Sequence, residues 1–415
     1  MKRHERLISV TVLLLAWLLA GGCDESSGDG DSGIECPDEA DPCPNDMVTD
    51  ESGCVWDRCG GGFTGKRIPC FWTDPEIDRG EMEFAGDHGQ YLAYIEKKEE
   101  YVYKGDVWLY DIELQERRRL TQDRLCYNLR AGGNRLGWLQ LVKESEHYHD
   151  TDVVDAYVMD LESGQEWHVP NPLERQTVDL DMSGNLVITR EMWMTTACPL
   201  GGKEIVRDLW LYDLTSGERR QVAAADPQSH VILGGRIADG MITYWKMTGP
   251  CADSVVNQLW VEDAAGEESR MLADTGNERP FAQSEYSFSF DGRWLVQLFG
   301  SYIDAFDVRS GESKRITRCS MSDCRLRGDA GLVAFDRYGE DGLTQRQVYV
   351  VEIETSKEQR VTDLRPYYDS SAPSGMVGNR LLWAERRGKN TIDDCGFEHR
   401  ATGWTSMYFW KEIVF

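Results

Sequence analysis

The chain has 415 residues, which is enough for two or three ordinary domains or for one large domain built from repeats. Its formal net charge of −27 argues against a nucleic-acid partner, because phosphate binding requires a basic surface. An acidic balance of this kind keeps an exported protein soluble and identifies no ligand by itself.

The first 22 residues have the pattern of a secretory signal. A basic start with Lys2, Arg3 and Arg6 precedes an apolar run over residues 7–20. This run is shorter than the roughly 20 apolar residues that a membrane-spanning helix needs. We therefore predict that residues 1–22 are a signal peptide that is removed on export.

A lipidation signal overlaps the end of this segment. Leu19-Ala20-Gly21-Gly22-Cys23 resembles the lipobox of bacterial lipoproteins, although its leucine lies four places before the cysteine and not the usual three. The resemblance implies that Cys23 becomes the lipid-modified first residue, and that this anchor is the only membrane contact. It also implies a place in the cell envelope, on the outer or inner membrane, periplasmic or surface-exposed. The alternative is ordinary signal peptidase, which would release a soluble protein.

Two short segments precede the main domain. Residues 23–35 are acidic and rich in Gly and Ser, which predicts a solvated spacer. Residues 36–62 have little apolar content, so disulfides are expected to replace a core there. The cysteines of this segment are Cys36, Cys43, Cys54 and Cys59. A zinc site is the alternative, but these spacings lack the tight cysteine pair typical of zinc ligands.

Part of this segment resembles an antistasin-type cysteine-rich module. The resemblance is carried chiefly by Asp50-Glu51-Ser52-Gly53-Cys54. Such a module normally has more cysteines than are present here. It therefore implies disulfide bonding, and protease inhibition is not carried over.

Residues 63–415 repeat one strand motif. It reads DVWLYDIELQERR at 106–118, DLWLYDLTSGERR at 208–220 and QLWVEDAAGEESR at 258–270, with weaker copies between and beyond. The copies lie 44 to 53 residues apart, a period typical of propeller blades or solenoids. Each unit has four short strands joined by hairpins, which favours a propeller. The aromatic residue of each motif, such as Trp108 or Trp210, is expected to stack neighbouring blades.

These units resemble the TolB-type propeller repeat over roughly residues 80–365. The pattern is carried by Trp108, Asp111, Leu120 and Thr121 in the first unit, and by Asp291, Gly292, Ile316 and Thr317 in the fifth. The resemblance implies a β-propeller. Propellers of this type include periplasmic interaction modules and the gating domains of prolyl oligopeptidase-like enzymes. No catalytic residue is carried over, because the sequence has no GxSxG motif.

The two ends of the repeat region predict the blade count. Residues 371–415 supply three strands of a last blade and no fourth. Lys66 to Pro69 parallels the fourth strand near residue 316, so we predict that this N-terminal strand closes the last blade and covers both sheet edges. The predicted fold is an all-β, seven-bladed β-propeller of four-stranded blades. Six blades are the alternative.

Long loops are predicted on one face of the propeller. Loops 143–155, 195–208, 246–257 and 385–406 are long and varied, whereas the turns of the opposite face are tight. Long loops on a rigid scaffold commonly carry binding, so we expect a protein or glycan partner on this face. The candidate binding residues are His147, Tyr148, His149, Asp150 and Trp404.

Two motifs could hold a metal ion. His147 and His149 flank Tyr148 among carboxylates, but no third ligand is identifiable, so no metal and no cofactor is expected. Asp179-Leu180-Asp181 looks like the start of a calcium loop, yet it aligns with the repeat and lacks the downstream glutamate. A structural role is expected for it.

The remaining cysteines are expected to form disulfides between loops in an oxidising compartment. The candidate pairs are Cys198 with Cys251, Cys70 with Cys395, and Cys319 with Cys324. Cys126 has no obvious partner.

These observations favour a binding module over an enzyme. The alternative is a carbohydrate-active hydrolase or lyase with its site at the mouth of the central channel. Such an enzyme would bring together two carboxyl groups from different blades, with raised pKa values, in one pocket.

Overall fold

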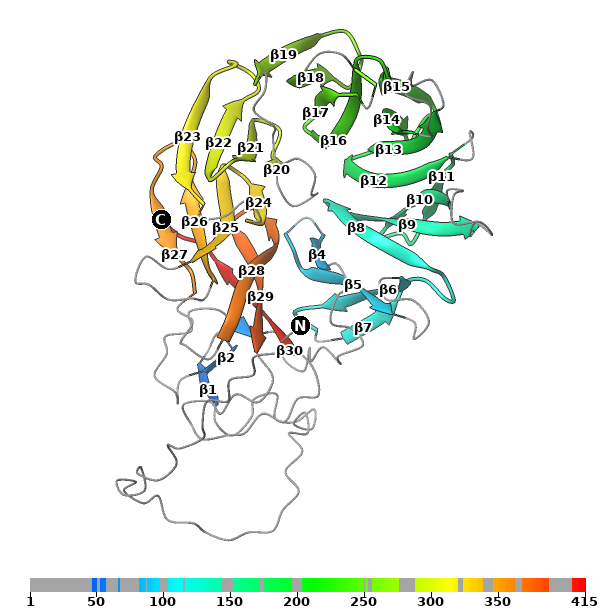
Figure 1. The fold of residues 1–415 in the computed structure, drawn as a ribbon. Coiled ribbons are helices and arrows are strands. Elements are labelled where there is room, and N and C mark those ends of the chain that lie inside the picture. Colours follow the sequence, from blue (N-terminus) through cyan, green and yellow to red (C-terminus); the bar gives the residue numbers. More distant parts are fainter. Residues whose placement is uncertain are drawn as a thin grey trace, which may run out of the picture. The chain divides into compact units, whose positions relative to one another are not determined.

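The computed structural model describes the chain in separate ranges. They are 47–50, 53–56, 66–67, 82–86, 88–97, 104–114, 116–143, 152–171, 175–195, 204–249, 251–252, 256–275, 288–319, 324–338, 346–362, 368–387 and 405–415. Every regular element within them is a β-strand (Figure 1).

The strands follow one another as antiparallel hairpins in groups, and each group is named here after its first strand. The β4 group holds β4 (Met82–Ala85), β5 (Tyr91–Lys97), β6 (Gly105–Asp111) and β7 (Glu116–Arg119). The β8 group holds β8 (Cys126–Gly132), β9 (Arg135–Lys143), β10 (Val153–Asp160) and β11 (Glu166–Val169). The β12 group holds β12 (Gln176–Ser183), β13 (Leu186–Thr195), β14 (Glu204–Asp213) and β15 (Arg219–Ala223).

The later groups repeat this order. The β16 group holds β16 (His230–Ala238), β17 (Met241–Thr248), β18 (Asn257–Asp263) and β19 (Ser269–Asp274). The β20 group holds β20 (Phe288–Phe290), β21 (Trp294–Phe299), β22 (Tyr302–Asp307) and β23 (Ser313–Arg318). The β24 group holds β24 (Leu326–Asp329), β25 (Leu332–Tyr338), β26 (Arg346–Glu352) and β27 (Glu358–Arg360). The β28 group holds β28 (Tyr368–Val377), β29 (Arg380–Arg387) and β30 (Thr405–Glu412).

The short strand β3 (Lys66–Arg67) pairs with β30. The pairing is antiparallel, with Lys66 opposite Trp410 and Arg67 opposite Phe409. A separate hairpin joins β1 (Met47–Asp50) to β2 (Gly53–Trp56) and places Cys54 opposite Thr49.

The repeated motif owes its turn to an aspartate at the end of the third strand, present in the groups from β4 to β20, whereas β26 and β30 end in glutamate. Asp213 Oδ1 accepts a hydrogen bond from the amide of Thr215 at 2.7 Å, and Asp160 Oδ1 accepts one from the amide of Ser163 at 2.8 Å. The glycine of the same turn has a positive φ, 74° at Gly217, a conformation that favours glycine. The Asp and the Ser-Gly of the motif therefore specify one tight turn.

A second aspartate ties each third strand to the link that leads to the next group. Asp106 Oδ1 accepts from the amide of Arg124 at 3.0 Å, and Asp208 Oδ1 accepts from the amide of Ala225 at 2.7 Å. These aspartates are buried, so their hydrogen bonds fix the start of the strand against the link.

The core lies between neighbouring groups. Leu109 of the β4 group packs with Leu129 and Trp138 of the β8 group, and equivalent clusters follow along the chain. Phe84 of the β4 group packs in the same way with Leu382 of the β28 group. The first and last groups of the repeat region are therefore in contact.

The aromatic residues of the motif pack against clusters between neighbouring groups, Trp108 beside Phe84 and Leu382 and Trp260 beside Ile188 and Tyr244, but they are not the most deeply buried aromatic residues. Trp108, Trp210 and Trp260 on third strands are half-buried, and basic side chains from neighbouring strands cover their rings. Arg219, for example, lies 3.9 Å from the centroid of the Trp210 ring. Among the residues whose burial the structure describes, the fully buried tryptophans are Trp138, Trp245 and Trp383, all on second strands. The second strand lies one strand nearer than the third to the common centre of the groups, which explains its deeper burial (Figure 1).

Candidate functional site

The first strands of the groups enclose a cavity of ≈ 620 Å³. β4, β8, β12, β16, β20, β24 and β28 all contribute to its wall, and Figure 1 shows these strands facing a common centre. Gly133, Gly184, Asn185 and Asp239 line it and are exposed to solvent. These residues belong to turns between first and second strands, so the cavity meets solvent at that face. We call it the axial cavity.

Three arginines occupy corresponding positions on the cavity wall. Arg130 on β8, Arg236 on β16 and Arg327 on β24 each lie on the first strand, shortly before its turn. In each case Nη1 donates a hydrogen bond to the carbonyl oxygen of the preceding residue, at 2.8, 2.7 and 3.0 Å respectively. This shared bond holds the three guanidinium groups in similar orientations.

A buried carboxylate connects two of these arginines. Asp179 on β12 has a side chain that is 3% exposed, and its Oδ2 lies 3.3 Å from Arg236 Nη1. Its Oδ1 lies 3.7 Å from Arg130 Nη2, and its Oδ2 lies 3.8 Å from Arg190 Nη2. The three arginine charges hold the pKa of Asp179 below its usual value although burial opposes this. Asp179 is therefore an ionised partner of three arginines, which agrees with the structural role expected for it.

Carboxylates near the turns link each group to the next. Asp181 Oδ2 accepts from the amide of Ile237 at 2.9 Å, and Asp291 Oδ2 accepts from the amide of Gly331 at 2.8 Å. Asp329 Oδ2 accepts from the amide of Gly378 at 2.7 Å. All three aspartates line the axial cavity, so its rim is acidic and held by hydrogen bonds between groups.

Two of these carboxyl groups have raised pKa values. Burial raises the pKa of Asp181 and of Asp329, and the charges of Asp291 and Asp239 raise that of Asp329 further. Both carboxyl groups line the axial cavity, Asp181 from the β12 group of strands and Asp329 from the β24 group. Their backbone donors give each a structural role as well.

We expect the stability of an Asp329→Asn variant relative to wild type to improve as pH rises. The folded protein binds the Asp329 proton more tightly than the unfolded chain, so the contribution of Asp329 to stability is present below the unfolded pKa of about 3.9 and is lost as pH rises through the folded pKa. Urea unfolding midpoints between about pH 3 and pH 7 measure the difference.

Asp213 is the matched control, with the opposite sign. Hydrogen bonds from the amide of Thr215 and neighbouring donors lower its pKa, so its contribution is present above the unfolded pKa and is lost as pH falls. The Asp213→Asn variant is therefore expected to lose stability relative to wild type as pH rises. Parallel curves for the two variants would contradict the prediction.

Most of the residues that the sequence singled out lie outside the described ranges. They are Cys23, Cys36, Cys43, Cys59, Cys70, His147, Tyr148, His149, Asp150, Cys198, Cys395 and Trp404. Cys251 is disulfide-bonded. The long-loop face that was expected to bind a partner thus remains a prediction. The axial cavity lies in the central channel, where the sequence had placed only the site of the alternative enzyme.

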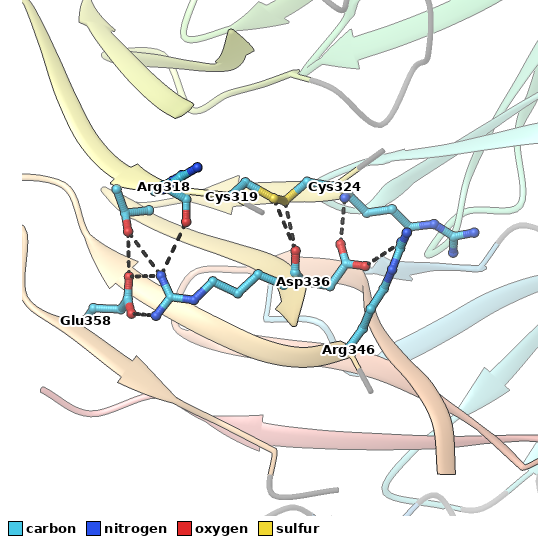
Figure 2. The surroundings of a disulfide bond; sticks show 9 residues. Arg318, Cys319, Cys324, Asp336, Arg346 and Glu358 are labelled. Carbon is cyan, nitrogen blue, oxygen red and sulfur yellow. Dashed lines mark hydrogen bonds and ion pairs between the residues drawn. A yellow bond between two sulfur atoms is a disulfide. The ribbon is translucent and has the colours of Figure 1, made fainter. Parts of the chain in front are cut away.

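The disulfide between Cys319 and Cys324 joins the pair proposed from the sequence, with a Cα–Cα distance of 6.5 Å. Figure 2 shows both sulfur atoms beside the carbonyl oxygen of Asp336, at 3.3 and 3.0 Å. The Asp336 carboxylate accepts from the amide of Arg325 at 2.7 Å and pairs with Arg346 at 3.1 Å. The disulfide therefore holds the end of β23 and the start of β24 close to the ion pair of Asp336 and Arg346.

Cys126 is a free, buried thiol. Burial raises its pKa to about 12, while a hydrogen bond to Thr121 acts in the opposite direction. Because the thiolate is the reactive form, we expect no labelling by a thiol reagent in the folded chain near pH 8 and rapid labelling in urea. A Cys126→Ser variant identifies the signal, and fast labelling of the folded wild type would contradict the burial.

A recurring sequence pattern surrounds Arg130, Arg236 and Arg327. NLRAGG, GGRIADG and LRGDAG each place an arginine within an otherwise apolar or small first strand, two to four residues before the glycine of a turn. A charged residue at an inward position of an inner strand is costly unless it has a role, so its recurrence could have indicated the cavity wall.

The described residues hold neither a cluster of metal ligands nor a membrane-spanning helix. In the part of the chain that the structure describes, no group of three or more His, Cys, Asp or Glu side chains could hold a metal ion. Within the same ranges, no helix has the length and apolar character needed to span a membrane.

Comparison with known proteins identifies the fold. No protein-family model matches the chain, and no curated protein matches it. An oligogalacturonate lyase solved in complex with manganese is 14% identical, with a TM-score of 0.52 over 89% of this chain and 96% of that chain. The β-propeller domain of the Trilobed protease from Pyrococcus furiosus is 12% identical, with a TM-score of 0.47 over 74% and 90% of the two chains.

A longer enzyme is also similar. Porphyromonas gingivalis dipeptidyl peptidase 4 is 10% identical, with a TM-score of 0.48 over 74% of this chain and 49% of that chain, so this chain spans about half of its length. At these identities the likenesses concern the fold alone. The chain is an all-β protein with β-propeller proteins among its structural neighbours.

Proposed function

We propose that this chain is a β-propeller that binds a glycan or protein partner in the cell envelope and takes a polar group of that partner into its axial cavity. The observation that carries the proposal is the cavity itself, ≈ 620 Å³ in volume, lined by every first strand and carrying charged side chains from β4, β8, β12, β16 and β24. Its volume lies within the range of small-molecule sites, which favours a sugar unit or a chain end over a flat protein surface. Hydrogen bonds between groups make the wall rigid, and rigidity lowers the entropy cost of binding.

The propeller is proposed to have seven blades and to be closed by β3, with a repeat of the TolB type. The support is the pairing of β3 with β30 and the packing of Phe84 against Leu382. Each group, with β3 counted in the last, then has four strands, and β3 pairs with the third strand of its group as the other fourth strands do. A crystal structure with β3 away from β30, or with six blades, would contradict this.

The location in the cell envelope is proposed from the sequence. Residues 1–22 would direct export, Cys23 would carry the lipid, and residues 23–62 would hold the propeller away from the membrane. Intact mass of the chain purified from membranes of the producing bacterium tests this. An acylated chain that starts at Cys23 supports it, and an unacylated soluble chain contradicts it.

A glycan array probed with the mature chain tests the binding role. We expect retention of a restricted set of glycans and loss of that retention when a bulky side chain narrows the cavity, as in Ala238→Trp, at a position on β16 two residues after Arg236. Unchanged retention in this variant would place binding elsewhere, for example on the long-loop face. No retention of any glycan, together with no partner in cross-linking on cells, would contradict the binding role.

A carbohydrate-active hydrolase or lyase is the second candidate. The observation that favours it is the pair of raised pKa values at Asp181 and Asp329 within one cavity. Incubation of the chain with polysaccharides and release of reducing or unsaturated ends tests it. Product formation that is abolished in Asp181→Asn or Asp329→Asn, with the fold intact, would favour the enzyme.

A further inference from the structure

We propose that Arg130 and Arg236 form an oxyanion site in the axial cavity, which binds a carboxylate or phosphate group of the ligand. The inference rests on the proposed function and specifies its ligand chemistry. It concerns positive charge in the interior of the cavity. The sequence had indicated only that the chain as a whole is acidic.

The two arginines are buried and face the same space. Each side chain is 9% exposed, and both line the axial cavity from strands on either side of β12. Taking a guanidinium out of water is costly unless an anion compensates for it. Asp179 compensates both charges within the protein, and the place of the two arginines on the cavity wall lets them also contact a ligand that brings negative charge.

Among the described residues with contacts to this cluster, arginines outnumber carboxyl groups around Asp179. Arg130, Arg190 and Arg236 all lie within 3.8 Å of the Asp179 carboxylate. Glu83 lies 3.4 Å from Arg130, and Asp181 is near enough to Arg130 and Arg236 for their charges to lower its pKa against the effect of burial. Arg207 adds a fourth positive charge beside Arg190. Four guanidinium groups thus face three carboxyl groups, in a chain whose total charge is −27.

The ion pairs that join Arg130 and Arg236 to Asp179 and Glu83 are long. Arg130 lies 3.4 Å from Glu83 and 3.7 Å from Asp179, and Arg236 lies 3.3 Å from Asp179, all beyond the usual 2.7–3.2 Å of a hydrogen bond. An incoming oxyanion can form shorter, paired bonds with a planar guanidinium, which suits carboxylate and phosphate geometry. The Asp179 carboxylate would then act as the positioning group that keeps both arginines in place.

The rim sets a condition on the rest of the ligand. Asp239, Asp291 and Asp329 line the cavity at or next to the turns that follow β16, β20 and β24, and these turns lie at the face where the cavity meets solvent. A bare polyanion is repelled by this rim, whereas hydroxyl or ammonium groups can donate hydrogen bonds to it. The site therefore fits one oxyanion on a ligand that is otherwise hydroxylated or cationic.

Isothermal titration of the mature chain with sodium phosphate and, separately, with sodium glucuronate tests the proposal. Each titration is matched by sodium chloride at equal ionic strength, so that screening is separated from binding. Saturable binding of either probe is expected. Binding of phosphate alone identifies a phosphate group as the natural anion, and binding of glucuronate alone identifies a carboxylate.

The variants Arg236→Gln and Arg236→Lys locate the site. The glutamine variant is expected to weaken binding at least about tenfold, because it removes a charged hydrogen-bond donor. The lysine variant keeps the charge and the fold but loses the paired geometry, so it is expected to weaken binding by an intermediate factor. Arg293→Gln is the matched control, since Arg293 is a half-exposed arginine of the β20 group whose loss removes the same charge.

Equal dissociation constants in wild type and both Arg236 variants would overturn the proposal, and so would the absence of saturable binding to either probe. The glycan array separates this failure from that of the proposed function. Glycans retained by wild type and by Arg236→Gln alike would leave the binding role intact and remove the oxyanion site. If wild type retained no glycan and also bound neither probe, both the binding role and the oxyanion site would be contradicted.

Discussion

Replacing Asp179 with alanine is expected to lower the free energy of unfolding by about 3–5 kcal/mol. The side chain is 3% exposed, and its removal leaves three buried arginines without their shared carboxylate. Breaking one side of a buried ion pair is costly because the remaining charge cannot be solvated. Urea unfolding at neutral pH measures the loss, and Asp179→Asn, which keeps the shape, is expected to show most of it.

Asp304→Ala is the control for Asp179. Asp304 pairs with Arg315, whose side chain is 58% exposed, so this pair is expected to contribute about 0–1 kcal/mol. Similar losses for Asp179 and Asp304 would show that the cluster around Asp179 is not the buried charged centre described above.

A Trp245→Ala variant is expected to lose about 3–5 kcal/mol of stability. Trp245 is fully buried between the β16 and β20 groups, where it packs with Leu259 and Leu295. Its ring lies 5.8 Å from that of Phe299 in an edge-to-face arrangement. Alanine would leave a large cavity between two sheets that cannot close it without moving apart.

Trp260→Ala is the matched comparison within the same group of strands. Trp260 is half-buried, and Lys246 Nζ lies 4.1 Å from its ring centroid. Its loss removes partial burial and a cation–π contact of about 0.5–1 kcal/mol, so a smaller effect is expected. Thermal or urea unfolding of both variants shows which substitution lowers the free energy of unfolding more. A larger loss at Trp260 would contradict the expected order and would show that the aromatic residues of the third strands contribute more to packing between groups.

The strand order was predictable from the sequence because local chemistry specifies it. The aspartate of each motif accepts hydrogen bonds in the turn, and Gly217 has the positive φ that this turn requires. These preferences act over four or five residues, so they are visible in one sequence. The short strand at Lys66 was found for a similar reason, since it repeats the pattern of other fourth strands.

The axial cavity was not predictable in the same way. Arg130, Arg236 and Asp179 lie far apart in the chain, and their contact depends on how separate sheets are placed around one axis. A single arginine on an inner strand looks like a solvated charge until its neighbours are known. The burial of Trp245 over Trp260 depends on the same placement, because both residues are aromatic and lie on adjacent strands.

A crystal structure of the mature chain soaked in sodium selenate tests the central claim most directly. Selenate has the tetrahedral shape of phosphate, and selenium gives an anomalous signal that marks its position. The account predicts an anomalous peak between Arg130 and Arg236, within hydrogen-bonding distance of both guanidinium groups, in a ring where β3 still pairs with β30. Selenium only at exposed surface arginines, with the axial cavity free of anion, would contradict it.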